Sequence, residues 1–225
     1  MQLILISIVY ILITIVCYLI SNKISKKCNN AIINPVLLSI IMILAILILS
    51  KNNYTDYSQG GNFITLLLGP ATTVLALPIY RQRALLKKHF LAIIVGTGIG
   101  SIASISCITV LGKLLGITTA QLSSLVPKSI TTPIAIAVSA NMGGIPAITV
   151  TAVIITGILG SVIAPSLIKV FKIKHPVAQG VGIGSCSHAI GTSKAIELGE
   201  DIGAMSGISI AFSGLFTVFW TLLFF

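Results

Sequence analysis

The segment Pro127-Lys128-Ser129-Ile130-Thr131-Thr132-Pro133 is polar and carries a lysine, yet apolar sequence surrounds it. A second such segment is Gly184-Ser185-Cys186-Ser187-His188-Ala189-Ile190-Gly191-Thr192-Ser193-Lys194. Hydrocarbon offers no water to unpaired backbone groups, so irregular, ionisable segments persist in a membrane only where they line a cavity enclosed by protein. The two segments therefore indicate where a membrane protein would handle something polar.

The composition is that of a membrane protein. Of the 225 residues, 56% are hydrophobic and 8% are charged, and the mean hydropathy is +1.09. About a quarter of the residues of a soluble domain are charged, so this chain has too little polar material to cover a surface in water. We predict an all-α, polytopic membrane protein. Residues 1–225 would form a single integral membrane domain, with N-terminal spans in 1–62 and a motif-bearing transport core in 63–225.

The apolar runs predict about six to eight hydrophobic segments, since about 20 apolar residues cross the hydrocarbon core as a helix. The clear spans are Leu3–Ile20, Pro35–Leu49, Phe90–Gly112, Ala147–Ile168 and Gly203–Phe225. Phe63–Tyr80 is predicted as a further span, although Gly69-Pro70 interrupts it. Pro127–Ala140 and Val177–Thr192 are short and rich in Pro, Gly, Ser and Thr, so we expect two interrupted or re-entrant helices there.

The net charge of +10 is concentrated in short segments next to the apolar runs. Ten of the fourteen basic residues are Lys23, Lys26, Lys27, Arg81, Arg83, Lys87, Lys88, Lys169, Lys172 and Lys174. This is the positive-inside pattern, and it favours a multi-pass protein of the bacterial cytoplasmic membrane that contacts anionic lipid headgroups. All three basic segments share one face if the Pro127 segment is re-entrant. A nucleic-acid role is not expected, because no basic and aromatic platform exists.

Lys128 is the first candidate for contact with a solute. A lysine beside a helix break can extend to the lipid headgroups, or it can bind an anion together with the hydroxyls of Ser129, Thr131 and Thr132. Free amides at a helix N-terminus also favour an anion such as a carboxylate. Pro133 either breaks the chain here or fits a first helical turn.

His188 is the second candidate, because an ionisable residue inside a membrane segment is a functional candidate by default. Imidazole titrates near neutrality, so His188 could couple transport to protons or donate a hydrogen bond to substrate. The neighbouring substrate-site candidates are Ser187, Gly191 and Thr192. Glu197 is a candidate for proton or ion coupling, but an i,i+3 pair with Lys194 explains it more simply.

Further helix breaks are predicted at Gly143, Gly144 and Pro146. A faint internal repeat accompanies them, because Thr72–Ala76 matches Thr131–Ala135 and Thr97–Ile99 matches Thr156–Ile158 at the same offset. Transporters are often built from such repeats. Coincidence is about as good an explanation in so biased a composition.

No enzyme, cofactor or metal site is expected from the sequence. The side chains of Ser187 and His188 diverge on any regular backbone, so they do not form a catalytic dyad. The four cysteines are scattered without metal-ligand or disulfide spacing. The glycines of Gly96–Gly100 lack the strand and nucleotide motif of a dinucleotide site, and they favour close helix packing instead.

Several motifs together resemble the LrgB/CidB family over roughly residues 30–225. These are Gly69-Pro70-Ala71-Thr72, Ala76-Leu77-Pro78-Ile79-Tyr80, the segment from Pro127 to Ala135, Gly143-Gly144-Ile145-Pro146, the segment from Ser187 to Ala195, and Gly203-Ala204-Met205-Ser206-Gly207.

The resemblance implies two functions. One is transport of small carboxylates, like pyruvate, or like glycolate and glycerate in plastid relatives. The other is holin/antiholin-like regulation of murein hydrolase export and cell lysis. It also implies a small LrgA/CidA-type membrane partner, and a homo-oligomer is a further expectation. The buried lysine, histidine and threonines between helix breaks favour the carboxylate transporter, because a lysis pore built from simple helices has no need of them.

Overall fold

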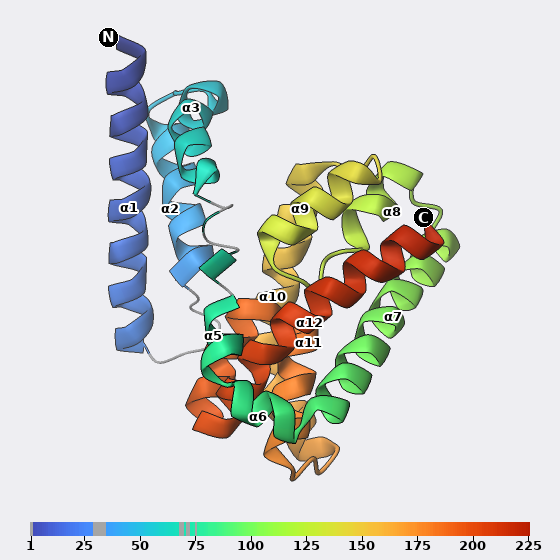
Figure 1. Ribbon diagram of the computed structural model, residues 1–225. Coiled ribbons are helices and arrows are strands. Elements are labelled where there is room, and N and C mark those ends of the chain that lie inside the picture. The colour runs from blue at the N-terminus through green and yellow to red at the C-terminus, as the bar shows by residue number, and fades with distance from the viewer. Residues whose placement is uncertain (1, 29–34, 68–69, 71–72, 75) are drawn as a thin grey trace. The chain divides into compact units, whose positions relative to one another are not determined.

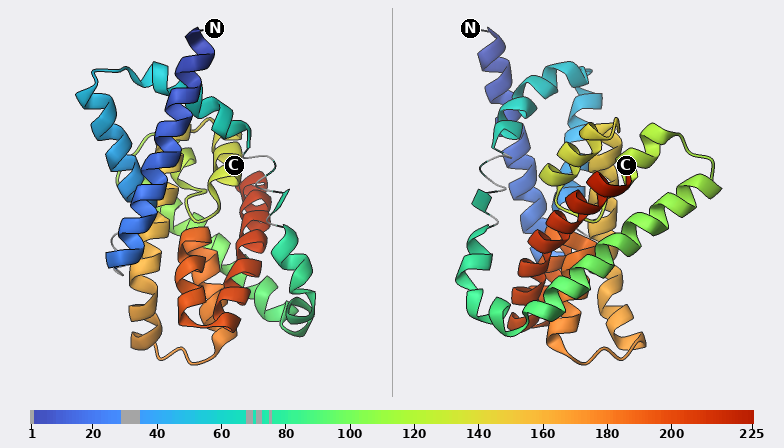
Figure 2. Two further views of the ribbon diagram at one scale, coloured as in Figure 1. Left: turned by 90° about the vertical axis from the view of Figure 1, so that its left-hand side faces the viewer. Right: turned by 45° about the vertical axis from the view of Figure 1, so that its right-hand side comes forward.

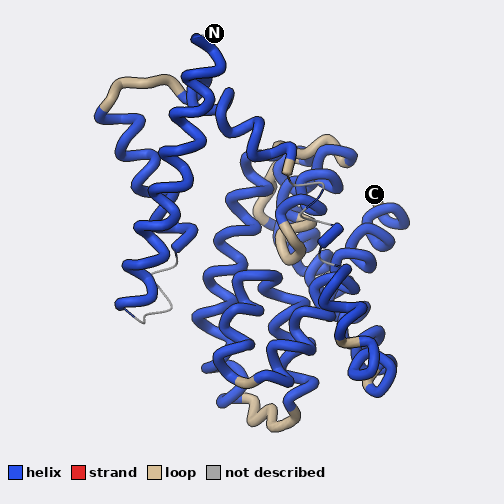
Figure 3. Tube along the Cα trace, turned by 60° about the vertical axis from the view of Figure 1, so that its left-hand side comes forward, coloured by secondary structure: helices blue, strands red, loops and turns tan. Residues whose placement is uncertain are grey.

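The computed structural model describes residues 2–28, 35–67, 70, 73–74 and 76–225, which form helices and no strand (Figures 1 and 3). Among these residues, four helices are long and apolar enough to cross a membrane, at Leu5–Cys28, Phe90–Leu114, Pro146–Val170 and Glu200–Phe224. Shorter apolar helices accompany them. The predicted all-α, polytopic architecture is confirmed. The chain divides into two compact units, Met1–Ala71 and Thr72–Phe225.

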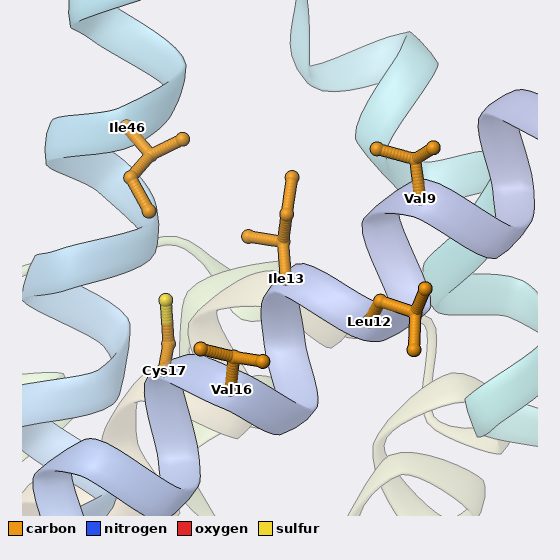
Figure 4. Close-up of a pocket in the computed structure, with 6 residues that line it drawn as sticks. All are labelled: Val9, Leu12, Ile13, Val16, Cys17 and Ile46. Carbon is orange, nitrogen blue, oxygen red and sulfur yellow. The ribbon is translucent and has the colours of Figure 1, made fainter.

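The first unit contains α1 (Gln2–Cys28), α2 (Pro35–Leu49) and α3 (Tyr54–Leu66). Its core is a cluster of Tyr10, Cys17, Ile43 and Leu47, against which Tyr57 packs. A pocket between α1 and α2 is lined by Val9, Leu12, Ile13, Val16, Cys17 and Ile46 (Figure 4). These side chains offer no charge or strong hydrogen-bonding group, so the pocket has no chemistry for a polar solute.

Two predictions for this part of the chain need correction. The helix α1 continues about two turns beyond the predicted end at Ile20, so Lys23, Lys26 and Lys27 lie on a helix and not in a loop. Lysine is a good helix former, and a helix that leaves the membrane can carry it. The predicted span Phe63–Tyr80 is not one helix, since α3 ends at Leu66 and the next long described segment begins at Ala76. Gly69 lies outside the described residues.

The second unit contains α5 to α12. Their bounds are α5 Ala76–Arg81, α6 Arg83–Lys88, α7 Phe90–Leu114, α8 Thr119–Leu125, α9 Thr132–Asn141, α10 Pro146–Val170, α11 Pro176–Leu198 and α12 Glu200–Phe224. Of these, α7, α10 and α12 run the length of the unit (Figure 1).

The helices α8 and α9 form a re-entrant hairpin between α7 and α10. A capping box of Thr118 and Gln121 starts α8, and a non-helical turn at 126–131 separates it from α9. The ten residues of α9 rise about 15 Å, which is half of the hydrocarbon thickness of about 30 Å. Ala135 clusters with Val153 of α10, and Ser139 bonds to Thr149, so α9 runs antiparallel to α10 and returns to the end where α8 began.

The helix α11 is a second re-entrant hairpin, and the chain reverses at His188 (φ 40°, ψ −142°). A Cβ on Gly191 would collide with Ile183 and Ser187, and Ala195 clusters with Ile183. A straight helix would hold Ile183 and Ala195 about 18 Å apart. The segment 189–198 therefore folds back along 176–187, and both lie against the first half of α12 (Figure 2). Both predicted re-entrant segments are thus present, with the second extending to Leu198.

The spanning helices carry their polar residues inward and their apolar residues outward, as a lipid solvent requires. On α10 one face exposes Ile155, Leu159, Ile163 and Leu167. The opposite face buries Thr149, Val153, Gly157 and Ser161. The interior of this unit is therefore rich in hydroxyl groups, and the apolar face remains available to lipid.

The buried faces of α7 and α10 repeat at a fixed spacing. Ile93, Thr97, Ser101 and Ile105 of α7 are followed 56 positions later by Thr149, Val153, Gly157 and Ser161 of α10. The helices α7 and α10 are each followed by a re-entrant hairpin, so a unit of one crossing and one hairpin occurs twice in opposite orientations. This arrangement differs from the predicted echo, because it pairs α8–α9 with α11 and does not involve Thr72–Ala76. The residues Thr97–Ile99 and Thr156–Ile158 do fall on matching helices.

Two of the basic segments lie at the same end of the unit. Leu85 and Leu86 of α6 pack against a cluster that contains Val177 at the start of α11. The rings of His89 and His175 are 6.3 Å apart between their centroids. Because the α8–α9 hairpin returns to its own side, α7 leaves this end and α10 comes back to it.

Candidate functional site

The site is built at the turn between α8 and α9. The Nζ atom of Lys128 donates hydrogen bonds to the Oγ atoms of Ser104 on α7 and Ser129, at 3.3 and 3.2 Å. The two serine hydroxyls are 2.9 Å apart and bond to each other. Among the described residues, Lys128 has no acidic partner. Lys128 is therefore a half-buried cation without a counter-charge in the described part of the chain.

The N-terminus of α9 lies directly after this lysine. Thr131 is the N-cap residue in extended conformation, but its side chain does not cap the helix. Only 6% of Thr131 is exposed. Its Oγ1 atom is buried and has no hydrogen-bond partner among the described residues. Pro133 occupies the first turn of α9, where its missing N–H costs nothing. Free amides, a free hydroxyl and a cation thus share one turn.

The second tip is at His188 of α11, which is 3% exposed. Its Nε2 atom lies 2.9 Å from the carbonyl oxygen of Val153. Since a carbonyl only accepts, Nε2 carries the hydrogen and donates it. The ring packs over Gly157, where a Cβ would collide with it. The glycine on α10 therefore makes room for the imidazole.

Val153 connects the two hairpins. Its side chain clusters with Ile130 and Ala135 of the first hairpin, while its carbonyl accepts the bond from His188 of the second. The tips of two hairpins that enter from opposite ends thus meet around the middle of α10.

The other predicted site residues hold the tips together. Thr192 donates to the carbonyl of His188 at 3.0 Å and bonds to the hydroxyl of Ser206 at 2.7 Å. Ser187 is buried against Gly160 and Gly191, neither of which has room for a Cβ. Thr132 is the half-buried first residue of α9. In the structure Ser187, Gly191 and Thr192 therefore have packing roles.

Glu197 lies away from both tips, on the exposed return segment of α11. Its carboxylate accepts a hydrogen bond from Lys194 at 2.7 Å, and the glutamate side chain is 63% exposed. The structure thus contains the i,i+3 ion pair between Lys194 and Glu197 that was the simpler explanation. The role of Glu197 in ion coupling stays a prediction.

The predicted breaks around Gly143 form the turn between α9 and α10. Gly143 has φ 72° and needs glycine's freedom, whereas Gly144 packs so closely on Ser124 and Ser139 that a Cβ would collide. Pro146 is the first residue of α10. This turn fixes the first hairpin to α10 and is not part of the tip.

Sequence reasoning missed Ser104, Val153 and Gly157. Ser104 belongs to a run of serines at 101, 104 and 106 within an apolar span, which was a usable signal. Val153 acts through its backbone carbonyl, and no sequence pattern reports that. In the described part of the chain, no cluster of three or more His, Cys, Asp or Glu could hold a metal ion.

Comparisons with known proteins identify the family of this chain. The model of the LrgB-like family matches residues 14–225. The chain belongs to the LrgB-like family. It is 37% identical to protein YwbG of Bacillus subtilis (strain 168) over 213 residues, which cover 95% of each chain. It is 39% identical to YxaC of the same strain over 205 residues, covering 91% of this chain and 89% of YxaC.

A third relative carries a functional name. The antiholin-like protein LrgB of Bacillus mycoides (strain KBAB4) is 38% identical over 183 residues, which cover 80% of each chain. No solved structure gives a significant match. The expected resemblance is confirmed, and this LrgB-like chain is a multi-pass bacterial membrane protein.

Proposed function

We propose that this LrgB-like protein transports small carboxylates through a single saturable site at the tips of its two hairpins. The observation that carries the proposal is Lys128, a half-buried ammonium whose partners among the described residues are hydroxyl groups. An uncompensated charge in a membrane interior is costly, and a bound carboxylate would neutralise it. The LrgB-like family and the antiholin-like names of relatives support a non-enzymatic function.

The surroundings of Lys128 suit a carboxylate. The N-terminus of α9 supplies partial positive charge and free amides, and the unpaired hydroxyl of Thr131 adds a hydrogen-bond donor. His188 approaches from the opposite hairpin, and it is the residue that we propose for proton coupling. Opposed broken helices that meet near the middle of a membrane are the usual setting for such a site.

The first prediction concerns the lysine. Lys128→Ala should reduce uptake of labelled pyruvate or glycolate by reconstituted vesicles more than tenfold, since a hydrogen bond to a charged group contributes about 1.5–3 kcal/mol. Lys113→Ala is the control, because Lys113 lies in the last turn of α7, away from the hairpin tips. Equal uptake by both variants at equal protein levels would show that Lys128 does not bind substrate.

A second candidate function is regulation of murein hydrolase export and cell lysis, as a holin-like or antiholin-like protein. The names of relatives such as the antiholin-like protein LrgB of Bacillus mycoides support it. A small LrgA/CidA-type membrane partner belongs to both proposals. Altered carboxylate flux could itself change lysis, so the two functions are compatible.

The second prediction separates the two functions. A transporter should saturate, should be inhibited by competing small carboxylates, and should leave vesicles closed to unrelated solutes. A pore should release dyes of many kinds without saturation. The measurement is carboxylate uptake and dye release from the same vesicles, with the LrgA-type protein present in a parallel sample. Dye release without saturable uptake in both samples would exclude the transporter.

A further inference from the structure

Ser213 on α12 has a buried hydroxyl that nothing in the described chain satisfies. The residue is 1% exposed, and its Oγ atom has no hydrogen-bond partner among the described residues. Leaving a buried hydroxyl unpaired costs about 1–3 kcal/mol. Such a group in a membrane interior therefore indicates a polar partner other than the described residues.

Ser213 lies next to the first turn of α9. The adjacent Gly214 packs against Ile134 of α9. A Cβ atom at position 214 would lie 3.0 Å from the Cδ1 atom of Ile134. Ile134 is one turn from Thr131, whose hydroxyl is also buried and unpaired. The segment of α12 that carries Ser213 therefore packs against the first turn of α9.

The hydrogen bonds of α7 also connect Ser213 to the lysine. Ser101 donates to the carbonyl of Ser213 at 3.4 Å. Ser104, one turn further along the same helix, accepts from Lys128. Ser213 is therefore separated from the candidate anion site by one helical turn of α7.

Ser213 follows the same 56-residue spacing as buried residues of α7 and α10. Gly157 follows Ser101 by 56 positions and precedes Ser213 by the same number, and all three are buried on their helices. Gly157 is the residue against which the ring of His188 packs. Position 213 is its counterpart on α12.

We infer that Ser213 is a specificity-determining residue that hydrogen-bonds a second oxygen of the substrate, on the carbon next to the carboxylate. The inference rests on the proposed carboxylate transport. Lys128 and the amides of α9 account for the carboxylate. The Thr131 hydroxyl also serves the carboxylate, so the remaining unpaired hydroxyl on Ser213 selects an acid with a neighbouring hydroxyl or keto oxygen over one without it.

The test compares glycolate with acetate, which differ by one hydroxyl. Vesicles containing the full chain take up labelled glycolate, and unlabelled glycolate or acetate competes. Ser213→Ala should weaken competition by glycolate about three- to tenfold, as expected for one neutral hydrogen bond. Competition by acetate should stay unchanged, which also shows that the variant is folded.

Ser209→Ala is the matched control, because Ser209 lies one turn earlier on α12, is fully buried, and donates its hydroxyl to the carbonyl of Met205. It should leave the ratio of glycolate to acetate competition as in the unmodified protein. If Ser213→Ala also leaves that ratio unchanged, or weakens both acids equally, Ser213 does not read the second oxygen, while saturable uptake still supports transport. If the unmodified protein shows no saturable uptake, the proposed function fails and this inference fails with it.

Discussion

His188 combines a strained backbone with a functional side chain. Its φ of 40° and ψ of −142° lie in a region that favours glycine, at a cost of about 1–3 kcal/mol for other residues. The imidazole bond to Val153 and the packing on Gly157 compensate for part of this cost. A residue with a side chain is retained at the reversal although glycine would be easier to accommodate, which supports a role for the ring.

The third prediction separates the backbone of His188 from its ring. His188→Gly and His188→Ala both lose the ring, so both should lose carboxylate uptake or its pH dependence. The glycine variant should unfold at the higher temperature in detergent, because glycine adopts a positive φ without strain. A more stable alanine variant would show that the reversal at residue 188 is not strained.

At the scale of elements, the α11 hairpin depends on glycines that let helices approach closely. Gly180 and Gly184 face α12, and Gly191 faces the other half of the hairpin. Small residues have this role in membranes because lipid does not drive helices together, so close packing and hydrogen bonds must do so. A Cβ on Gly182 would meet nothing within 4 Å, so this glycine is free of the constraint.

The fourth prediction tests this packing. Gly191→Ala should destabilise the protein by about 1–3 kcal/mol, because the new methyl group would collide with Ser187 and separate the two halves of α11. Gly182→Ala should be neutral or slightly stabilising, since alanine favours a helix. Thermal unfolding in detergent, followed by circular dichroism, measures both. Equal stability of the two variants would contradict a hairpin closed at Gly191.

At the scale of the whole molecule, the second unit is an inverted arrangement of crossings and hairpins. The helix α7 starts at the basic end and the hairpin α8–α9 enters from the opposite end, whereas α10 starts at that opposite end and the α11 hairpin enters from the basic end. The basic segments around Lys87 and Lys172 share an end, and the turn at Gly143 belongs to the opposite end. The positive-inside pattern then favours a cytoplasmic location for the basic end.

The fifth prediction concerns this topology. Single cysteines at Lys87, Lys172 and Lys26 should resist membrane-impermeant thiol reagents in intact cells, and a cysteine at Gly143 should react. The background lacks Cys17, Cys28, Cys107 and Cys186. Labelling of position 87 or 172 from outside would overturn the cytoplasmic assignment. Position 26 tests the charge pattern alone, since it belongs to the first unit.

The sequence by itself determined the class of the protein, its four long apolar helices and both interrupted segments. Lipid imposes strong rules on composition, so apolar length and the location of Lys128 and His188 were sufficient for these predictions. The positions of helix ends were less certain, as the extension of α1 to Cys28 shows, because lysine-bearing turns are equally compatible with a helix or a loop. Phe63–Tyr80 was predicted as a span with an interruption at Gly69-Pro70, but α3 already ends at Leu66, because apolar content does not report where a helix ends.

Only the tertiary structure decided which residues meet. Ser104 and Lys128 are 24 positions apart, and Val153 and His188 are 35 apart, so neither contact leaves a local pattern. The reversal at His188 was suggested by composition, but the packing of Gly191 on Ile183 establishes that the chain folds back. The unpaired hydroxyls of Thr131 and Ser213 are likewise a property of the packed helices, because a hydroxyl is satisfied or left free only by its neighbours in space.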